Sequence, residues 1–151
     1  MRKVRYGLVG CGAWGSHHAR AISQCPRAKL IAVADCDEDA RRQVRTSYPD
    51  IVVLADCREL LAIEEIDVVD VVLPNHLHHE TGRAVLDAGK HLLMEKPMAL
   101  SIAECDDLIE RARARKLVLG VAHQFRLSSL WGRIKELLDA DGFRHLPVSY
   151  L

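Results

Sequence analysis

The sequence lacks an excess of charge of either sign, a long apolar run and a recognisable leader segment. Lys and Arg together number 21, and Asp and Glu together number 21, so the formal net charge is zero. Without excess positive charge a chain has no general surface for polyanions, and we expect neither nucleic acid nor an anionic membrane as partner. No run approaches the ~20 apolar residues of a membrane-spanning helix. The residues after Met1 lack the apolar segment of a signal peptide, and we expect a cytoplasmic protein.

Paired cysteines are also missing. The five cysteines are widely spaced and contain no Cys-x-x-Cys pair, standing at Cys11, Cys25, Cys36, Cys57 and Cys105. This pattern argues against a zinc ribbon and a disulfide framework, and it fits a reducing compartment. We expect these residues to act as small buried hydrophobic side chains.

The chain does contain short β-branched runs that alternate with longer helical patterns. Its 151 residues, 49% apolar and 28% charged, suit one globular domain, or one domain and a fragment of a second. The alternation predicts an α/β fold: a doubly wound, mostly parallel Rossmann sheet with helices on both faces. The expected strands are 4–9, 29–34, 51–53, 66–73, 91–94 and 117–122, and the expected helices are 14–24, 37–47, 57–62, 78–88, 101–115 and 127–139.

A glycine-rich turn joins the first expected strand to the first expected helix. Gly10, Gly12 and Gly15 form the Gly-x-Gly-x-x-Gly pattern of dinucleotide-binding folds. Gly10 permits the tight turn, Gly12 lets the backbone approach a pyrophosphate, and Gly15 lets the helix pack close to the strand. Free amides at the start of the helix would then bind the phosphates.

Asp35 ends the second expected strand, twenty residues after Gly15. A carboxylate there accepts hydrogen bonds from both ribose hydroxyls of adenosine and repels a 2′-phosphate, which favours NAD over NADP. Arg41 and Arg42 either weaken that preference or form a solvated helix face. Two alternatives stay open here: a ligand-free glycine turn with a helix-capping Asp, and a methyltransferase-type sheet, in which an acidic residue also holds a ribose.

The segment Glu95-Lys96-Pro97 directly follows the fifth expected strand. In an open parallel sheet the carboxyl ends of the strands line the ligand crevice. We therefore expect Lys96 to reach the site, although an isolated lysine in a loop would ordinarily be a solvent-exposed side chain.

Four segments follow one another along the chain: 10–15 at the glycine-rich turn, 33–35 at the end of the second strand, 73–78 as a Pro-Asn-x-x-His segment, and 88–97 ending in Glu-Lys-Pro. In these segments and their order the chain resembles the glucose-fructose oxidoreductase / inositol dehydrogenase (Gfo/Idh/MocA) family. The stretch through Arg126 is similar to the family's Arg-Phe segment, although Leu127 and Ser129 stand where Phe and Pro are common.

The resemblance implies hydride transfer between a nicotinamide ring and a carbinol or ketone carbon, usually of a sugar or cyclitol. Lys96 would be the catalytic residue that positions and polarises the reacting oxygen. Asn75 would lie near the nicotinamide, with Glu95 bracing the same edge. The implied cofactor-binding residues are Gly10, Gly12, Ala13, Trp14, Gly15, Asp35, Leu73, Pro74, Asn75, His78, Glu95, Lys96 and Arg126. The expected cofactor is NAD, with NADP as the alternative.

The family's second α/β domain is expected to be absent. In the family it supplies most substrate contacts, a histidine general acid/base and the oligomer interface. We expect an NAD(P)-binding Rossmann domain at 1–125, then a connecting helix and the start of a truncated second domain at 126–151, with a strand beginning at 147–151. Catalysis by this chain alone should be weak or missing, and uncovered apolar surface would favour a homo-oligomer.

The spacing of the histidines argues against a metal site. Three of them lie within 76–79, but no carboxylate or cysteine cluster accompanies them at zinc-like spacing. We expect no metal site. His78 is expected to pack or cap at the helix start, and His17 and His18 to be surface or helix-packing residues. His123 is a further candidate at the crevice.

The leading hypothesis is thus the cofactor domain of an oxidoreductase. One alternative is a non-catalytic dinucleotide-binding module, a redox sensor or a subunit, which the missing second domain favours. Another is a methyltransferase-like enzyme, against which the Glu95-Lys96-Pro97 segment argues.

Overall fold

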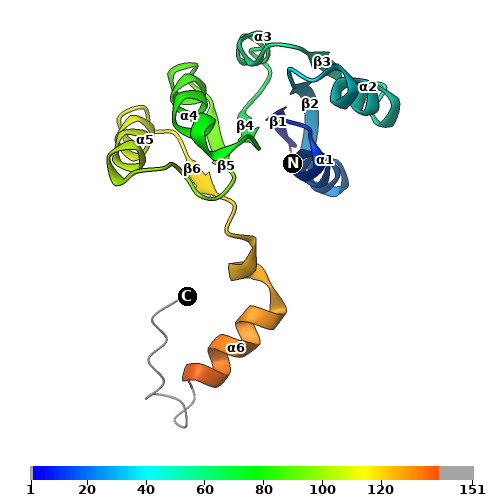
Figure 1. Ribbon diagram of the computed structural model, residues 1–151. Helices are drawn as coiled ribbons and strands as arrows, with labels where there is room; N and C mark the ends of the chain where they lie inside the picture. The colour runs from blue at the N-terminus through cyan, green and yellow to red at the C-terminus, as the bar shows by residue number, and fades with distance from the viewer. Residues whose placement is uncertain (1, 140–151) are drawn as a thin grey trace.

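The computed structural model describes residues 2–139, which form a six-stranded parallel sheet with helices on both faces (Figure 1). The strands are β1 (Val4–Val9), β2 (Ala28–Ala34), β3 (Val52–Leu54), β4 (Val68–Val71), β5 (His91–Met94) and β6 (Leu119–Val121). Their order in the sheet is β3-β2-β1-β4-β5-β6, and every neighbouring pair is parallel. The direction of winding reverses between β1 and β4, where such sheets place their ligand crevice. The prediction of a doubly wound Rossmann sheet is confirmed.

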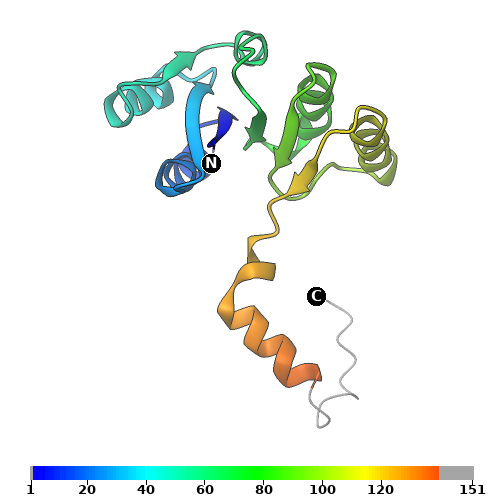
Figure 2. The same cartoon turned by 180° about the vertical axis from the view of Figure 1, so that it is seen from behind.

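Two groups of helices cover the sheet (Figures 1 and 2). The helices α1 (Ala13–Gln24) and α2 (Glu38–Ser47) pack on one face, over a core that includes Leu8 and Val33. The helices α3 (Cys57–Leu61), α4 (His78–Asp87) and α5 (Ile102–Ala114) pack on the other, over Val69 and Val71. Because both faces are covered, the central strands are mostly apolar, as parallel sheets usually are, and Asp70 of β4 is the buried exception.

Local signals in the sequence fix where helices begin. The Asp37 side chain accepts hydrogen bonds from the Asp39 and Ala40 amides and so caps α2. Ser101 and Glu104 form a complete capping box at the start of α5, as their spacing predicts. Strands β1 and β5 have the expected bounds.

Three expected elements differ from the structure by two residues at an end. The strand expected at 117–122 is confined to Leu119–Val121. The strand expected at 66–73 is confined to Val68–Val71, and the Asp67 carboxylate instead accepts a hydrogen bond from the Arg5 amide. The helix expected at 127–139 is α6, which begins only at Ser129, because Gln124–Leu127 forms a separate 3-10 turn, η2. The strand expected at 147–151 lies outside the described residues.

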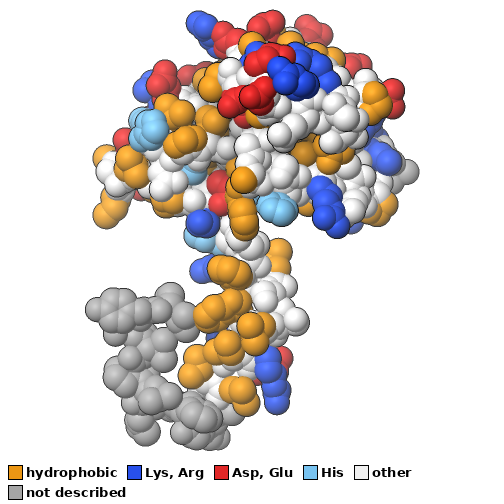
Figure 3. Space-filling model, turned by 45° about the vertical axis from the view of Figure 1, so that its right-hand side comes forward, with side chains coloured by type: hydrophobic (Ala, Val, Ile, Leu, Met, Phe, Trp, Pro, Cys, Tyr) orange, Lys and Arg blue, Asp and Glu red, His pale blue; other side chains and the backbone are white. Residues whose placement is uncertain are grey.

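The helix α6 (Ser129–Asp139) extends away from the sheet, below it in Figures 1 and 2. None of its residues is buried. Hydrophobic side chains gather along it and along η2 (Figure 3), among them the exposed Phe125, Leu127, Leu130 and Leu137. This segment therefore presents an apolar surface that no other part of the described chain covers. No helix in that part combines the length and apolar character needed to cross a bilayer.

The expectation of buried cysteines is wrong for most of them. Cys11 alone is buried, whereas Cys25 and Cys36 are exposed and Cys57 and Cys105 are half-buried. The two exposed cysteines stand in loops immediately beyond α1 and β2, where no neighbouring element covers them.

Candidate functional site

The glycine-rich turn contains two glycines that packing requires and one that it does not. Gly10 has φ of +89°, and a Cβ there would lie 2.1 Å from the Val72 carbonyl oxygen. A Cβ on Gly15 would lie 2.1 Å from the Gly10 carbonyl oxygen. At Gly12 a Cβ would meet nothing within 4 Å. The fold therefore explains Gly10 and Gly15, while the space beside Gly12 remains open to a ligand.

The helix that follows this turn begins without a side-chain cap. Its N-cap residue is Gly12, whereas Asp37, Asp56 and Ser101 cap α2, α3 and α5 with their side chains. Amides in the first turn of a helix need an acceptor from outside the helix. The residues Ala13 and Trp14 thus start a helix whose amides fit an anionic group such as a pyrophosphate.

Asp35 stands at the carboxyl end of β2 and is oriented by the backbone. Its Oδ2 accepts a hydrogen bond from the Cys11 amide at 2.7 Å, and its Oδ1 accepts one from the Asp37 amide at 2.9 Å. Each oxygen keeps a second lone pair, so the carboxylate can still accept ribose hydroxyls. Burial and the Asp35 charge raise the pKa of the Cys11 thiol to about 12, which keeps this thiol protonated.

Arg41 and Arg42, two of the three arginines of α2, both form ion pairs within that helix. The Arg41 guanidinium donates to the Asp35 carbonyl oxygen at 2.6 Å and forms an ion pair with Glu38, and its side chain is only 12% exposed. Arg42 lies on the solvated side of the helix and pairs with Asp39. Of the two expectations for these arginines, the structure favours the solvated helix face for Arg42 and internal pairing for Arg41.

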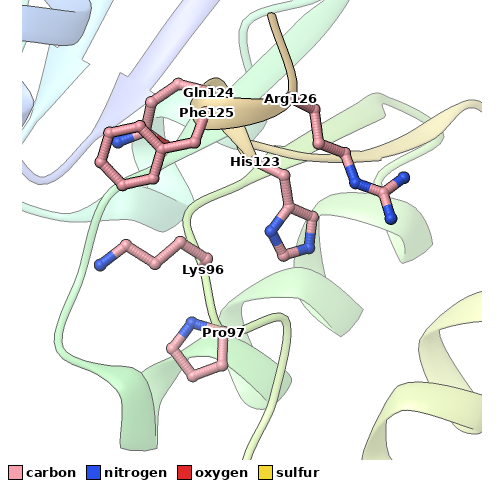
Figure 4. Close-up of a pocket in the computed structure, with 6 residues that line it drawn as sticks. All are labelled: Lys96, Pro97, His123, Gln124, Phe125 and Arg126. Atoms are coloured by element: carbon pink, nitrogen blue, oxygen red, sulfur yellow. The ribbon is translucent and has the colours of Figure 1, made fainter. Parts of the chain in front are cut away.

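Lys96 follows β5 and lines a pocket of about 340 Å³ together with Pro97, His123, Gln124, Phe125 and Arg126 (Figure 4). The structure thus brings Lys96 together with His123 and Arg126, which come from the segment after β6. In Figure 4 the Lys96 ammonium and the Arg126 guanidinium point to opposite sides. Lys96 is exposed, as a residue that meets a substrate must be.

Residues 73–78 connect β4 to α4 and lie near the same turn. Pro74 and Asn75 are exposed and Leu73 is half-buried. His78 is fully buried, with Nδ1 2.7 Å from the Pro97 carbonyl oxygen and Nε2 2.9 Å from that of Leu73. His78 therefore joins the Leu73 and Pro97 segments, and it is a packing residue at the start of α4.

A buried cluster beside Lys96 was not foreseen from the sequence. The His18 imidazole, expected to pack or to lie on the surface, bridges Asp70 and Glu95, and Glu95 also accepts from the Trp14 indole. The sequence feature that could have indicated this cluster is Asp70, a lone carboxylate inside an otherwise apolar parallel strand. Burial opposes ionisation of Glu95, but the hydrogen bonds from Trp14, the Lys96 amide and His18 lower the pKa of its carboxyl group.

Within residues 2–139, no group of three or more His, Cys, Asp and Glu side chains is arranged to hold a metal ion. His79, one of the histidines in 76–79, instead lies 2.8 Å from Asp107 on α5.

Comparison with known proteins agrees with this geometry. A family model described as an oxidoreductase family with an NAD-binding Rossmann fold (GFO_IDH_MocA) matches residues 4–123. Inositol 2-dehydrogenase 1 of Saccharopolyspora erythraea is 35% identical over 141 residues, which cover 91% of this chain and 42% of that protein. The inositol 2-dehydrogenase/D-chiro-inositol 3-dehydrogenase of Shouchella clausii is 33% identical, over 91% of this chain and 41% of that protein. The chain therefore spans about two fifths of the length of these curated relatives.

Solved structures of related proteins have the same fold as this chain. GenD2 from gentamicin A biosynthesis, in complex with NAD, superposes with a TM-score of 0.87 at 28% identity, covering 93% of this chain and 40% of GenD2. The WlbA dehydrogenase of Bordetella pertussis, in complex with NADH and UDP-GlcNAcA, superposes with a TM-score of 0.84 at 28% identity, covering 91% of this chain and 42% of WlbA. The match to an NAD-binding oxidoreductase model decides against the methyltransferase alternative.

Proposed function

The chain belongs to the Gfo/Idh/MocA oxidoreductase family, whose fold binds NAD, and from this membership we propose that it is the cofactor-binding part of a dehydrogenase acting on a sugar or cyclitol. One observation carries the proposal. The open turn at Gly12, the carboxylate of Asp35 and the ammonium of Lys96 follow the carboxyl ends of β1, β2 and β5, which meet at one edge of the sheet. An extended dinucleotide lies along such an edge.

The adenosine half of the cofactor would be held by the first two strands. The amides of Ala13 and Trp14 would bind the pyrophosphate, with Gly12 leaving room for its approach. The Asp35 carboxylate would accept the ribose hydroxyls. The Arg41 guanidinium is held by the Asp35 carbonyl oxygen and by Glu38, so it is not free to bind a 2′-phosphate, and the Asp35 carboxylate would repel that group. NAD is therefore the proposed cofactor.

Chemistry would take place at Lys96. NAD, when bound, supplies a hydride acceptor at its nicotinamide ring. The Lys96 ammonium would donate a hydrogen bond to the reacting oxygen of the substrate and polarise it. The Glu95 carboxylate accepts the Lys96 amide at 2.9 Å and so fixes the backbone from which that ammonium extends. Asn75 and Arg126 would border the nicotinamide and the substrate.

The substrate class is inferred from relatives. Two are named as inositol dehydrogenases, and the WlbA structure holds UDP-GlcNAcA, so a ring with several hydroxyl groups is common to them. We infer a polyhydroxylated ring as substrate of the complete protein. A non-catalytic dinucleotide-binding module would bind the cofactor equally well, and hydride transfer from NADH to an inosose by this chain would contradict that alternative.

Calorimetric titration of the 151-residue chain with NADH, NADPH and S-adenosylmethionine tests the proposal. We expect saturable binding of NADH alone. Asp35→Asn keeps the size of the side chain but removes the charge and leaves one oxygen to accept one of the two backbone amides, so NADH should bind about tenfold more weakly and NADPH more tightly than to the wild type. Asp39→Asn is the matched control, because this exposed residue lies on α2 outside the site. A folded chain that binds no NADH, or an Asp35→Asn variant that binds it unchanged, would contradict the proposal.

A further inference from the structure

His18, whose side chain is 17% exposed, lies at the centre of a partly buried cluster that connects three elements of the fold. On α1, its Nδ1 lies 2.8 Å from Asp70 Oδ2 of β4, and its Nε2 lies 3.1 Å from Oε1 of Glu95, the residue that follows β5. The side chains of Asp70 and Glu95 are 1% and 6% exposed. Two buried carboxylates thus face the same imidazole ring, and both need a donor or a cation to be stable there.

The hydrogen-bonding pattern assigns a positive charge to this ring. A neutral imidazole has a single N–H, so one of its nitrogens would point a lone pair at a carboxylate, whereas an imidazolium donates to both. Consistently, the hydrogen bond with Asp70 outweighs burial and raises the pKa of His18. The other titratable groups around the cluster are Tyr6 of β1 and, beside its members in the chain, His17 and Lys96.

Within residues 2–139, the His18 ring is the only hydrogen-bond partner of the Asp70 carboxylate. Its Oδ1 is buried and has no hydrogen-bond partner among the residues that the structure describes, and its Oδ2 bonds only to His18. Loss of His18 would leave two buried carboxylates without a cation between them. Their repulsion would act on Glu95, which follows the end of β5, and on Asp70, which lies within β4.

The Glu95 carboxylate connects α1 to the backbone of Lys96 by hydrogen bonds. Its Oε1 accepts hydrogen bonds from Trp14 Nε1 at 2.9 Å and from His18, and its Oε2 accepts the Lys96 amide at 2.9 Å. Trp14 and His18 are four residues apart and so lie on the same face of α1. The helix that starts at the phosphate turn is therefore connected to the catalytic lysine through one carboxylate.

We propose that His18 is a positioning residue, whose bridge from Asp70 to Glu95 sets the Lys96 turn relative to the Gly12 turn and thereby shapes the nicotinamide half of the cofactor site. The proposal rests on the proposed function, since it assumes that the nicotinamide lies against the Lys96 turn. It assigns no role to His18 in the adenosine half, which Gly12 and Asp35 would hold. The two halves of the cofactor therefore give separate readouts.

Titrations with NADH and with ADP-ribose, which lacks the nicotinamide, test this role in the full chain. The variant His18→Gln with Asp70→Asn removes one positive and one negative charge, so the cluster keeps its net charge while it loses the bridge. We expect its NADH affinity to fall roughly tenfold or more, and its ADP-ribose affinity to stay within about twofold of the wild type. Arg20→Gln, at an exposed position of the same helix, should bind both ligands as the wild type does.

Each other outcome has a definite meaning. Equal losses for NADH and ADP-ribose would show that His18 only supports α1, and unchanged NADH affinity would show that the bridge has no effect on the nicotinamide; both overturn the proposal. A wild-type chain that binds the two ligands equally well overturns it too. A folded wild type that binds neither ligand contradicts the proposed function itself. Independently of any ligand, ¹⁵N NMR should show both ring nitrogens of His18 protonated at pH 7, and a neutral ring would overturn the charge assignment.

Discussion

Alanine substitutions at Gly12 and Gly15 should separate cofactor binding from folding. Gly15→Ala would put a methyl group 2.1 Å from the Gly10 carbonyl oxygen, more than 1 Å inside normal contact, and a backbone carbonyl cannot rotate away as a side chain can. Overpacking of this kind costs about 1–3 kcal/mol. Gly12 has φ of −61° and ψ of −162°, which alanine adopts without strain, and a Cβ there meets no atom. The stability of Gly12→Ala should stay within about 0.5 kcal/mol of the wild type.

Gly12→Ala should weaken NADH binding although it leaves the stability of the fold nearly unchanged. A methyl group at Gly12 occupies the space through which a pyrophosphate approaches the amides of α1, and losing one charge-assisted hydrogen bond costs about 1.5–3 kcal/mol. NADH affinity should therefore fall roughly 10- to 100-fold in Gly12→Ala. Urea unfolding followed by circular dichroism measures the stability of each variant, and calorimetry measures NADH binding. Wild-type affinity in Gly12→Ala would refute the placement of the pyrophosphate, and wild-type stability in Gly15→Ala would refute the packing argument.

Three further predictions concern stability. The guanidinium and amide of Arg5 hold the Asp67 carboxylate and lower its pKa to about 2, so its contribution is complete above about pH 4 and lost as the pH falls toward 2. Asp67→Asn should cost about 1–2 kcal/mol in urea unfolding at neutral pH, and an equal cost at pH 2 would contradict this account. Ser101→Ala removes the capping box of α5 and should cost about 1 kcal/mol, and a loss below 0.3 kcal/mol would mean that α5 is held by packing alone. Since the pKa of His18 is raised, its contribution is complete below about pH 6.5 and lost as the pH rises through the raised value. The wild type should then lose more stability between pH 6 and 9 than a variant carrying His18→Gln and Asp70→Asn, and parallel pH curves would argue against a charged ring.

The elements that sequence reasoning located well are those whose signals are local. Strand β1 is an apolar run that ends at the glycine turn, and α5 begins with a Ser and a Glu at capping-box spacing. The expected positions of Gly10, Gly15 and Asp35 follow from the same local rules, because a tight turn and a strand end determine them. Such signals need no knowledge of what packs against them.

Contacts between elements that are distant along the chain could not be predicted from the sequence. The partners of His18 are 52 and 77 residues away along the chain, and periodicity predicts which face of α1 is buried but not which charged side chain that face meets. The pairing of Arg41 with the Asp35 carbonyl depends on how α2 packs, and the 3-10 turn after β6 includes Leu127, where the last helix was expected to begin. These features arise from tertiary packing, which overrides local preference.

The strand order also constrains how the chain folds during its synthesis. β1 is central in the sheet, yet its partner β4 ends 62 residues later, at Val71 as against Val9. A ribosome that adds 5–20 residues per second needs about 3–12 s to make that segment. Until β4 is made, β2 is the only strand of the finished sheet that β1 can pair with, and the other edge of β1 stays open to strands of neighbouring nascent chains. The speed of elongation between residues 9 and 71 should therefore influence the yield of folded protein, independently of the stability that the finished sheet attains.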